Sequence, residues 1–255
     1  MRKCSLSAIN SVFEAISQSQ MLFLPVDNKD GAAEYKKWEQ GMKWSEQLNT
    51  LRSPKDFFFP QLENMMEFKV EGKNIELIDI RTAQAPFVVF GVRACDAKAF
   101  EVLDNVFQVE PVDSYYSERR AHGVIITLAC NKPSETCFCK TFGIDAANPG
   151  GDISVWKSET EVFWQANTEK GAALLAKLGL EECGDDAVNA EKEKIGAIME
   201  KLPLASLTTE GFGANFVENI FDPATCKGAL KFDGRVTTIP ARAFVACTNL
   251  TQIEL

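Results

Sequence analysis

Four cysteines of this chain are spaced as ligands of an iron-sulfur cluster. Cys130, Cys137 and Cys139 lie in one short segment, and Cys95 lies upstream. Four thiolates complete the coordination of one 4Fe-4S cluster. A Cys-x-Cys pair chelates a single tetrahedral ion less comfortably than Cys-x2-Cys, but it can span two corners of a cubane. The residue types and their spacing therefore favour one 4Fe-4S cluster held by these four thiolates.

Two other interpretations of the same cysteines stay open. The four residues can be small apolar side chains that pack at strand ends, or they can form a structural Cys4 zinc site. Core packing alone explains poorly why a Cys-x-Cys pair lies within ten residues of another cysteine. The remaining cysteines are scattered, and we expect core or surface positions for them: Cys4, Cys183, Cys226 and Cys247.

Two buried strands and a helix are expected to position the cysteines. The apolar runs at residues 87–92 and 124–129 are typical of buried strands and end close to Cys95 and Cys130. Residues 96–107 between them carry apolar side chains at helical spacing. The segment therefore predicts a βαβ unit with parallel strands. The first free amides of its helix would point toward the cluster and offset its negative charge.

Three basic residues are close to the cysteines in sequence, namely Arg93, Lys132 and Lys140. If they lie near the cluster, they would raise its reduction potential.

The rest of the chain is expected to supply hairpins and peripheral helices. The predicted fold class is α/β, or α+β, with a mixed sheet whose βαβ unit carries the cysteine site. Three regions are predicted: an α+β region with hairpins at 1–86, the α/β iron-sulfur region at 87–220, and a C-terminal segment at 221–255. We expect helices at 5–18, 170–178 and 187–201, the last with a solvated charged face, strands at 21–26, 35–38, 66–70, 75–80, 153–156 and 161–164, and a packed aromatic loop at 53–63.

Composition excludes several classes of function. A formal charge of −9 argues against nucleic acid as the main partner. No apolar stretch approaches the length of a membrane span, and polar residues interrupt any signal-peptide region after the N-terminus, so we expect a cytoplasmic location without membrane insertion. The single histidine, His122, which we expect in a loop, nearly excludes catalytic triads and multi-histidine metal sites. The motifs of nucleotide-binding loops and nucleophile elbows are also absent from the sequence.

Several segments, in the same order, resemble one family of redox subunits. The segments are GVRACDAKAFEVLD, YYSERRAHGVIITLAC, ETCFCKTFG and SPKDFFFPQLE. They resemble the beta subunit of cytoplasmic sulfhydrogenase-type nickel-iron hydrogenases and the related A subunit of anaerobic sulfite reductase, over approximately residues 20–220. Those subunits carry electrons between a flavin-containing, pyridine-nucleotide-oxidising subunit and a catalytic subunit. The resemblance supports Cys95, Cys130, Cys137 and Cys139 as ligands of a 4Fe-4S cluster.

The resemblance stops near the C-terminus. Family members continue into a ferredoxin-like part with two CxxCxxCxxxCP runs, whereas this chain has only Cys226 and Cys247 in the corresponding region. We therefore expect a shortened electron path. Either a partner supplies the other clusters, or this chain is a truncated or diverged member of the family.

The expected function is an iron-sulfur electron-transfer subunit that is not catalytic alone, with a flavoprotein subunit and a catalytic redox subunit as partners. Exposed apolar surface, including residues 57–59, would mark the docking face. The alternative is a non-redox scaffold subunit whose cysteine site is vacant or holds zinc.

Overall fold

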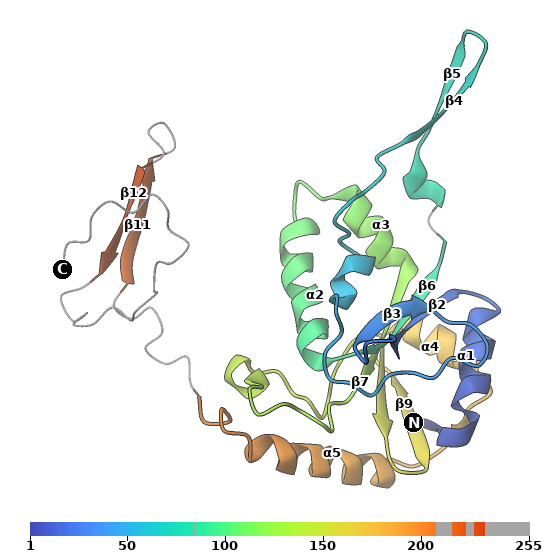
Figure 1. Cartoon of the computed structure of the whole chain (residues 1–255), viewed down its shortest axis with the longest axis vertical. Coiled ribbons are helices and arrows are strands. Elements are labelled where there is room, and N and C mark those ends of the chain that lie inside the picture. Colours follow the sequence, from blue (N-terminus) through green and yellow to red (C-terminus); the bar gives the residue numbers. More distant parts are fainter. Residues whose placement is uncertain (84, 208–215, 223–226, 233–255) are drawn as a thin grey trace. The chain divides into compact units, whose positions relative to one another are not determined.

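The computed structural model describes residues 1–83, 85–207, 216–222 and 227–232 (Figure 1). The chain divides into two compact units, Met1–Ser206 and Leu207–Leu255. The three-part division into 1–86, 87–220 and 221–255 stays a prediction. Cys226 and Cys247 lie outside the described residues.

The first unit is built on one mixed eight-stranded sheet, with strand order β10-β1-β9-β8-β7-β6-β2-β3. The central strands β2, β6, β7 and β8 run parallel, and the flanking pairs are antiparallel. The predicted α/β fold class with a mixed sheet is confirmed. The strands are β1 Arg2–Ser5, β2 Met21–Asp27, β3 Ala33–Lys37, β6 Phe87–Val92, β7 Gly123–Leu128, β8 Ile153–Lys157, β9 Glu161–Ala166 and β10 Glu181–Glu182.

The predicted βαβ unit is confirmed, because helix α2 (Ala94–Phe107) lies between β6 and β7 in the chain and the two strands pair in parallel. Every residue of β6 and β7 is buried, which explains their continuous apolar sequences. A second helix, α3 (Ser114–His122), precedes β7, so the expectation that His122 lies in a loop is wrong. The Asp113 carboxylate begins α3 by accepting hydrogen bonds from the amides of Tyr115 and Tyr116.

Successive side chains of β6 face the two opposite sides of the sheet. Val88 and Phe90 pack with helices α1 (Ile9–Ser17) and α4 (Glu169–Leu175), whereas Phe87 and Val89 pack with α2 and α3. Figure 1 shows the two pairs of helices on opposite sides of the sheet. The sheet is therefore the middle of three layers, with a hydrophobic core on each of its two faces.

The N-terminal residues differ from the expected helix at 5–18. Arg2–Ser5 form strand β1, which pairs with β9 on one side and with β10 on the other. The helix begins only at Ile9, after the 3-10 turn η1 (Leu6–Ala8). The Ser5 hydroxyl caps this turn by accepting from the Ala8 amide. The helix prediction was correct for residues 9–17, where Val12, Phe13 and Ile16 are buried.

A separate hairpin, formed by β4 (Glu67–Glu71) and β5 (Asn74–Ile78), extends from the first unit (Figure 1). The residues that share one of its faces, Phe68, Val70, Ile75 and Leu77, are 58–68% exposed. The second unit contains the strands β11 (Phe216–Asp222) and β12 (Lys227–Phe232), which pair antiparallel. Among the described residues, no helix combines the length and the apolarity that a membrane crossing requires.

Candidate metal centre

All four predicted cysteines line one cavity of about 240 Å³. Cys95 and Cys130 reach it from the carboxyl ends of β6 and β7, and Cys137 and Cys139 reach it from the loop after β7. Parallel strands end at the same edge of a sheet, which explains why residues 35 positions apart meet there. The other lining residues are Leu48, Asn49, Thr50, Ser53, Arg93, Ala94, Asp96, Pro133, Ala146 and Met199.

Cys95 lies in the first turn of α2, where backbone amides are not used by the helix itself. The N-cap residue Arg93 directs its side chain to the Gln47 carbonyl oxygen (3.2 Å) rather than to these amides. The amide of Asp96 hydrogen-bonds to the Cys95 sulfur. Free amides at a helix start favour a negative charge, but at Cys95 the hydrogen bond with Cys139, burial and the Asp96 carboxylate outweigh them and raise the pKa of the thiol.

Two of the thiols contact each other directly. A hydrogen bond between Cys95 and Cys139 raises the pKa of Cys95 and lowers the pKa of Cys139. Burial raises the pKa of the Cys130 thiol, against the opposing charge of Arg93. The three sulfurs therefore differ in environment: Cys95 is exposed, Cys139 is half-buried and Cys130 is buried.

The loop after β7 is shaped by its own backbone hydrogen bonds. The Cys130 amide donates to the Ala146 carbonyl (3.1 Å), which joins the two ends of the loop. The Cys137 amide donates to the Ser134 carbonyl (3.0 Å), and the Ser134 amide donates back to the Cys137 sulfur (3.3 Å). Amides that donate to sulfur stabilise a thiolate, and such bonds are one means of tuning an iron-sulfur site.

One of the three predicted basic residues lies at the cavity. Arg93 lines it. Lys132 instead pairs with Glu46 (3.1 Å), and Lys140 pairs with Glu200 (2.5 Å). Proximity in the sequence could not show which of the three basic side chains lies at the cavity, because the carboxylates that bind the two lysines come from distant parts of the chain.

The structure adds two elements that the sequence analysis did not connect with the site. Helix α5 (Asp186–Glu200) was expected to be a solvated charged helix, but its Val188, Ile195 and Met199 are buried and Met199 lines the cavity. Their spacing of seven and four residues is the helical signal that could have revealed this face. Residues 48–53 form a second wall of the cavity, and their sequence has no periodic pattern that would have predicted this position.

Four thiols that line one cavity are a donor set that suits an iron-sulfur cluster. A water molecule needs about 10–15 Å³ of cavity volume by this measure, so the cavity is many times larger. In a cubane each thiolate binds a different iron, and four thiols spread around a cavity suit that arrangement. Among the described residues, no group of three or more His, Cys, Asp or Glu side chains is arranged to hold a single metal ion.

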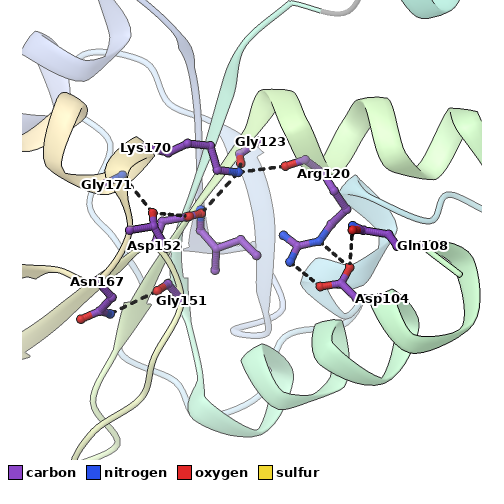
Figure 2. A network of polar contacts seen from close by, with 11 residues as sticks. Asp104, Gln108, Arg120, Gly123, Gly151, Asp152, Asn167, Lys170 and Gly171 are labelled. Atoms are coloured by element: carbon purple, nitrogen blue, oxygen red, sulfur yellow. Dashed lines mark hydrogen bonds and ion pairs between the residues drawn. The ribbon is translucent and has the colours of Figure 1, made fainter.

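A second polar network lies at the starts of β7 and β8 (Figure 2). The buried Asp152 carboxylate accepts from the Ile125 amide (2.9 Å) and the Thr168 hydroxyl (2.7 Å). The Lys170 ammonium lies 3.9 Å from Asp152 and donates to the carbonyl oxygens of Arg120 and Gly123 (2.9 Å each). This network fixes the start of β7 and the end of α3, and thereby supports the strand that leads to the cysteine loop.

Comparison with known proteins finds one similar protein. The chain is 38% identical over 104 residues to the Sulfhydrogenase 2 subunit beta of Pyrococcus furiosus. This chain resembles a sulfhydrogenase beta subunit. The match covers 41% of this chain and 29% of the relative, so the chain spans less than a third of that protein's length. No family model matches the chain, and no solved structure matches it.

Proposed function

We propose that this chain is an iron-sulfur electron-transfer subunit of a cytoplasmic oxidoreductase complex. It relays electrons between a flavin- and NAD(P)H-linked subunit and a catalytic subunit of the hydrogenase or sulfite reductase type, and it is not catalytic alone. The observation that carries the proposal is the single cavity lined by Cys95, Cys130, Cys137 and Cys139. The resemblance to a protein named as a sulfhydrogenase subunit supports the redox role.

In this proposal, the four cysteines hold one 4Fe-4S cluster, which when bound supplies one-electron transfer. The residues of the chain orient and tune the site. The amides of Asp96 and Ser134 donate to the sulfurs of Cys95 and Cys137, and Arg93 adds a positive charge at the cavity wall. Both effects favour the more negative, reduced form of such a site and therefore raise its reduction potential.

The contact with a redox partner is proposed for the cysteine loop. Phe138 lies between two of the proposed ligands, packs edge-on against Phe142 at 5.7 Å between ring centroids, and is half exposed, as is Phe142. An electron partner that docks here would lie directly over Cys137 and Cys139. Of residues 57–59, which were expected at the docking face, Phe58 is fully buried, whereas Phe59 is 46% exposed.

Reconstitution of the complex tests the electron-transfer role. The Cys137→Ser complex is expected to lose electron flow between the two partners while each partner keeps its activity with artificial dyes. Cys183→Ser is the matched control, because this cysteine lies outside the cavity, and its complex is expected to behave as the wild type. If the Cys137→Ser complex transfers electrons at the normal rate, the site is off the electron path and the scaffold interpretation, with zinc or a vacant site, replaces this one.

A further inference from the structure

Residues 45–53, here termed the cover segment, form one wall of the cysteine cavity. Leu48, Asn49, Thr50 and Ser53 all line it. Residues 45–49 belong to no helix or strand, so regular backbone hydrogen bonding does not hold them in place. The position of this wall therefore depends on individual contacts to other elements, among them a hydrogen bond from the Ser45 amide to the Pro25 carbonyl (2.6 Å).

The two ends of the cover segment are attached to the sheet and to α2. At its start, the Ser45 hydroxyl donates to the Asp27 carboxylate (2.5 Å) at the end of β2. Near its end, the Leu51 amide donates to the Ala33 carbonyl (2.8 Å), and the Ser53 hydroxyl donates to the Asp96 carboxylate (2.9 Å). These contacts hold the ends of the segment.

Glu46 attaches the same segment to the cysteine loop and to the sheet at once. Its carboxylate receives the ammonium of Lys132 (3.1 Å), which lies two residues after Cys130, and the ammonium of Lys157 at the end of β8. Lys157 is 18% exposed and also lies 5.9 Å from the centroid of the Trp44 ring. One carboxylate therefore joins the cover segment to the cysteine loop and to the end of β8.

The charge of this carboxylate is secure at neutral pH. The hydrogen bond from Lys157 lowers the pKa of Glu46 to about 2. A single exposed ion pair contributes little, but here two lysines share one acceptor, and one of the two is mostly buried.

We propose that Glu46 is a positioning residue that latches the cover segment over the cysteine cavity and thereby limits the access of dissolved reagents to the cysteines. The part of the proposal that concerns protection of a bound cluster rests on the proposed function. The part that concerns protection of the free thiols rests on the cavity alone. The reagents concerned are of a small, water-soluble class: alkylating agents, iron chelators and dissolved oxidants.

The first test uses the full chain without a cluster, under anaerobic reducing conditions at one fixed pH. The rate of alkylation by iodoacetamide is measured at each cysteine by mass spectrometry. Loss of ion pairs of this class corresponds to about a two- to fivefold change in a local opening equilibrium. We expect Glu46→Ala to raise the rate at the buried Cys130 by about that factor. Cys183 lies outside the cavity in the same molecule, and its rate is expected to stay constant.

Two further variants separate the latch from a general loss of stability. Glu161→Gln removes an ion pair with Lys3 that is remote from the cavity lining, and it is expected to leave Cys130 protected. Glu46→Gln keeps an acceptor for the lysines without the charge, and it is expected to fall between the wild type and Glu46→Ala. An unchanged Cys130 rate in both Glu46 variants, or equal acceleration at Cys130 and Cys183, overturns the proposal.

The second test measures iron release to a chelator from protein that has been reconstituted with iron and sulfide. We expect faster release from Glu46→Ala than from the wild type or Glu161→Gln. If wild-type protein assembles no cluster, the proposed function fails while the alkylation assay still decides on the latch. If wild-type protein assembles a cluster and the Glu46 variants match it in both assays, the latch fails and the proposed function stands.

Discussion

Replacement of Asp104 by alanine is expected to destabilise the first unit substantially. The Asp104 carboxylate accepts two hydrogen bonds from the Arg120 guanidinium (2.8 and 2.7 Å) and one from the Tyr116 hydroxyl (2.7 Å). Arg120 lies over the rings of Phe58 and Phe100. The variant would leave this cation without its carboxylate on an aromatic surface, and it would leave the buried Tyr116 without its acceptor.

The size of the effect follows from how far the pair is buried. Removal of one partner of a buried ion pair costs about 3–5 kcal/mol. The side chains of Arg120 and Asp104 are 19% and 25% exposed, and solvent screening reduces the cost to about 2–4 kcal/mol. For a domain of this size, that corresponds to a melting temperature lower by about 5–15 °C.

The assay is thermal and urea unfolding of the wild type and the variant at pH 7. Glu101→Ala is the matched control on the same helix, because Glu101 makes an exposed ion pair with Lys98, and the expected change is within about 0.5 kcal/mol. A loss below about 1 kcal/mol for Asp104→Ala would refute the argument, because such a value is typical of a solvent-exposed pair.

The pH dependence gives a second readout of the same pair. Burial alone would raise the pKa of Asp104, but the hydrogen bonds from Arg120 and Tyr116 outweigh it, and the folded pKa lies below the ordinary value of 3.8. A depressed pKa stabilises the fold above that ordinary value, and this contribution is lost as the pH falls through the folded pKa. The difference between the wild type and Asp104→Ala is therefore expected to persist down to about pH 5 and to narrow below about pH 4.

Three other substitutions test the site and the packing. Cys95→Ser is expected to remove most iron from reconstituted protein and Cys183→Ser to leave it unchanged, and iron analysis that gives the reverse would show that the ligand set is wrong. Arg93→Gln is expected to lower the reduction potential in a redox titration followed by EPR, because it removes the positive charge that lines the cavity; an unchanged potential would contradict that role. Gly171→Ala places a Cβ 2.1 Å from a backbone carbonyl oxygen, so we expect a loss of about 1–3 kcal/mol in denaturant unfolding. Gly196→Ala meets no atom within 4 Å in the described residues, and as a helical control it is expected to be neutral or stabilising; similar losses for both variants would contradict the packing at Gly171.

The elements that carry the cysteines could be predicted from the sequence because their pattern is local. The runs that became β6 and β7 are apolar throughout, and both strands are buried throughout. Helix α3 lacks such a pattern, since Tyr116 is its one fully buried residue, and it was not predicted. The strand at Arg2–Ser5 owes its conformation to pairing with β9 and β10, more than 150 residues away in the sequence.

The walls of the candidate site are less predictable than its ligands. The spacing of Cys95, Cys130, Cys137 and Cys139 indicated a shared site, and the structure brings the four together around one cavity. The contact of Glu46 with Lys157 joins residues 111 positions apart, and no spacing rule predicts it. Lys132 and Lys140 are close to the cysteines in the sequence, and they likewise bind carboxylates from other segments.

The metal and sulfide content of the chain distinguishes a 4Fe-4S cluster from zinc at the four cysteines. The protein is made under iron-replete, oxygen-free conditions, and iron, zinc and acid-labile sulfide are determined per chain. We expect about four iron and four sulfide, a brown colour, and loss of both elements in a variant with all four cavity cysteines replaced by serine. One zinc per chain with no acid-labile sulfide would contradict this expectation.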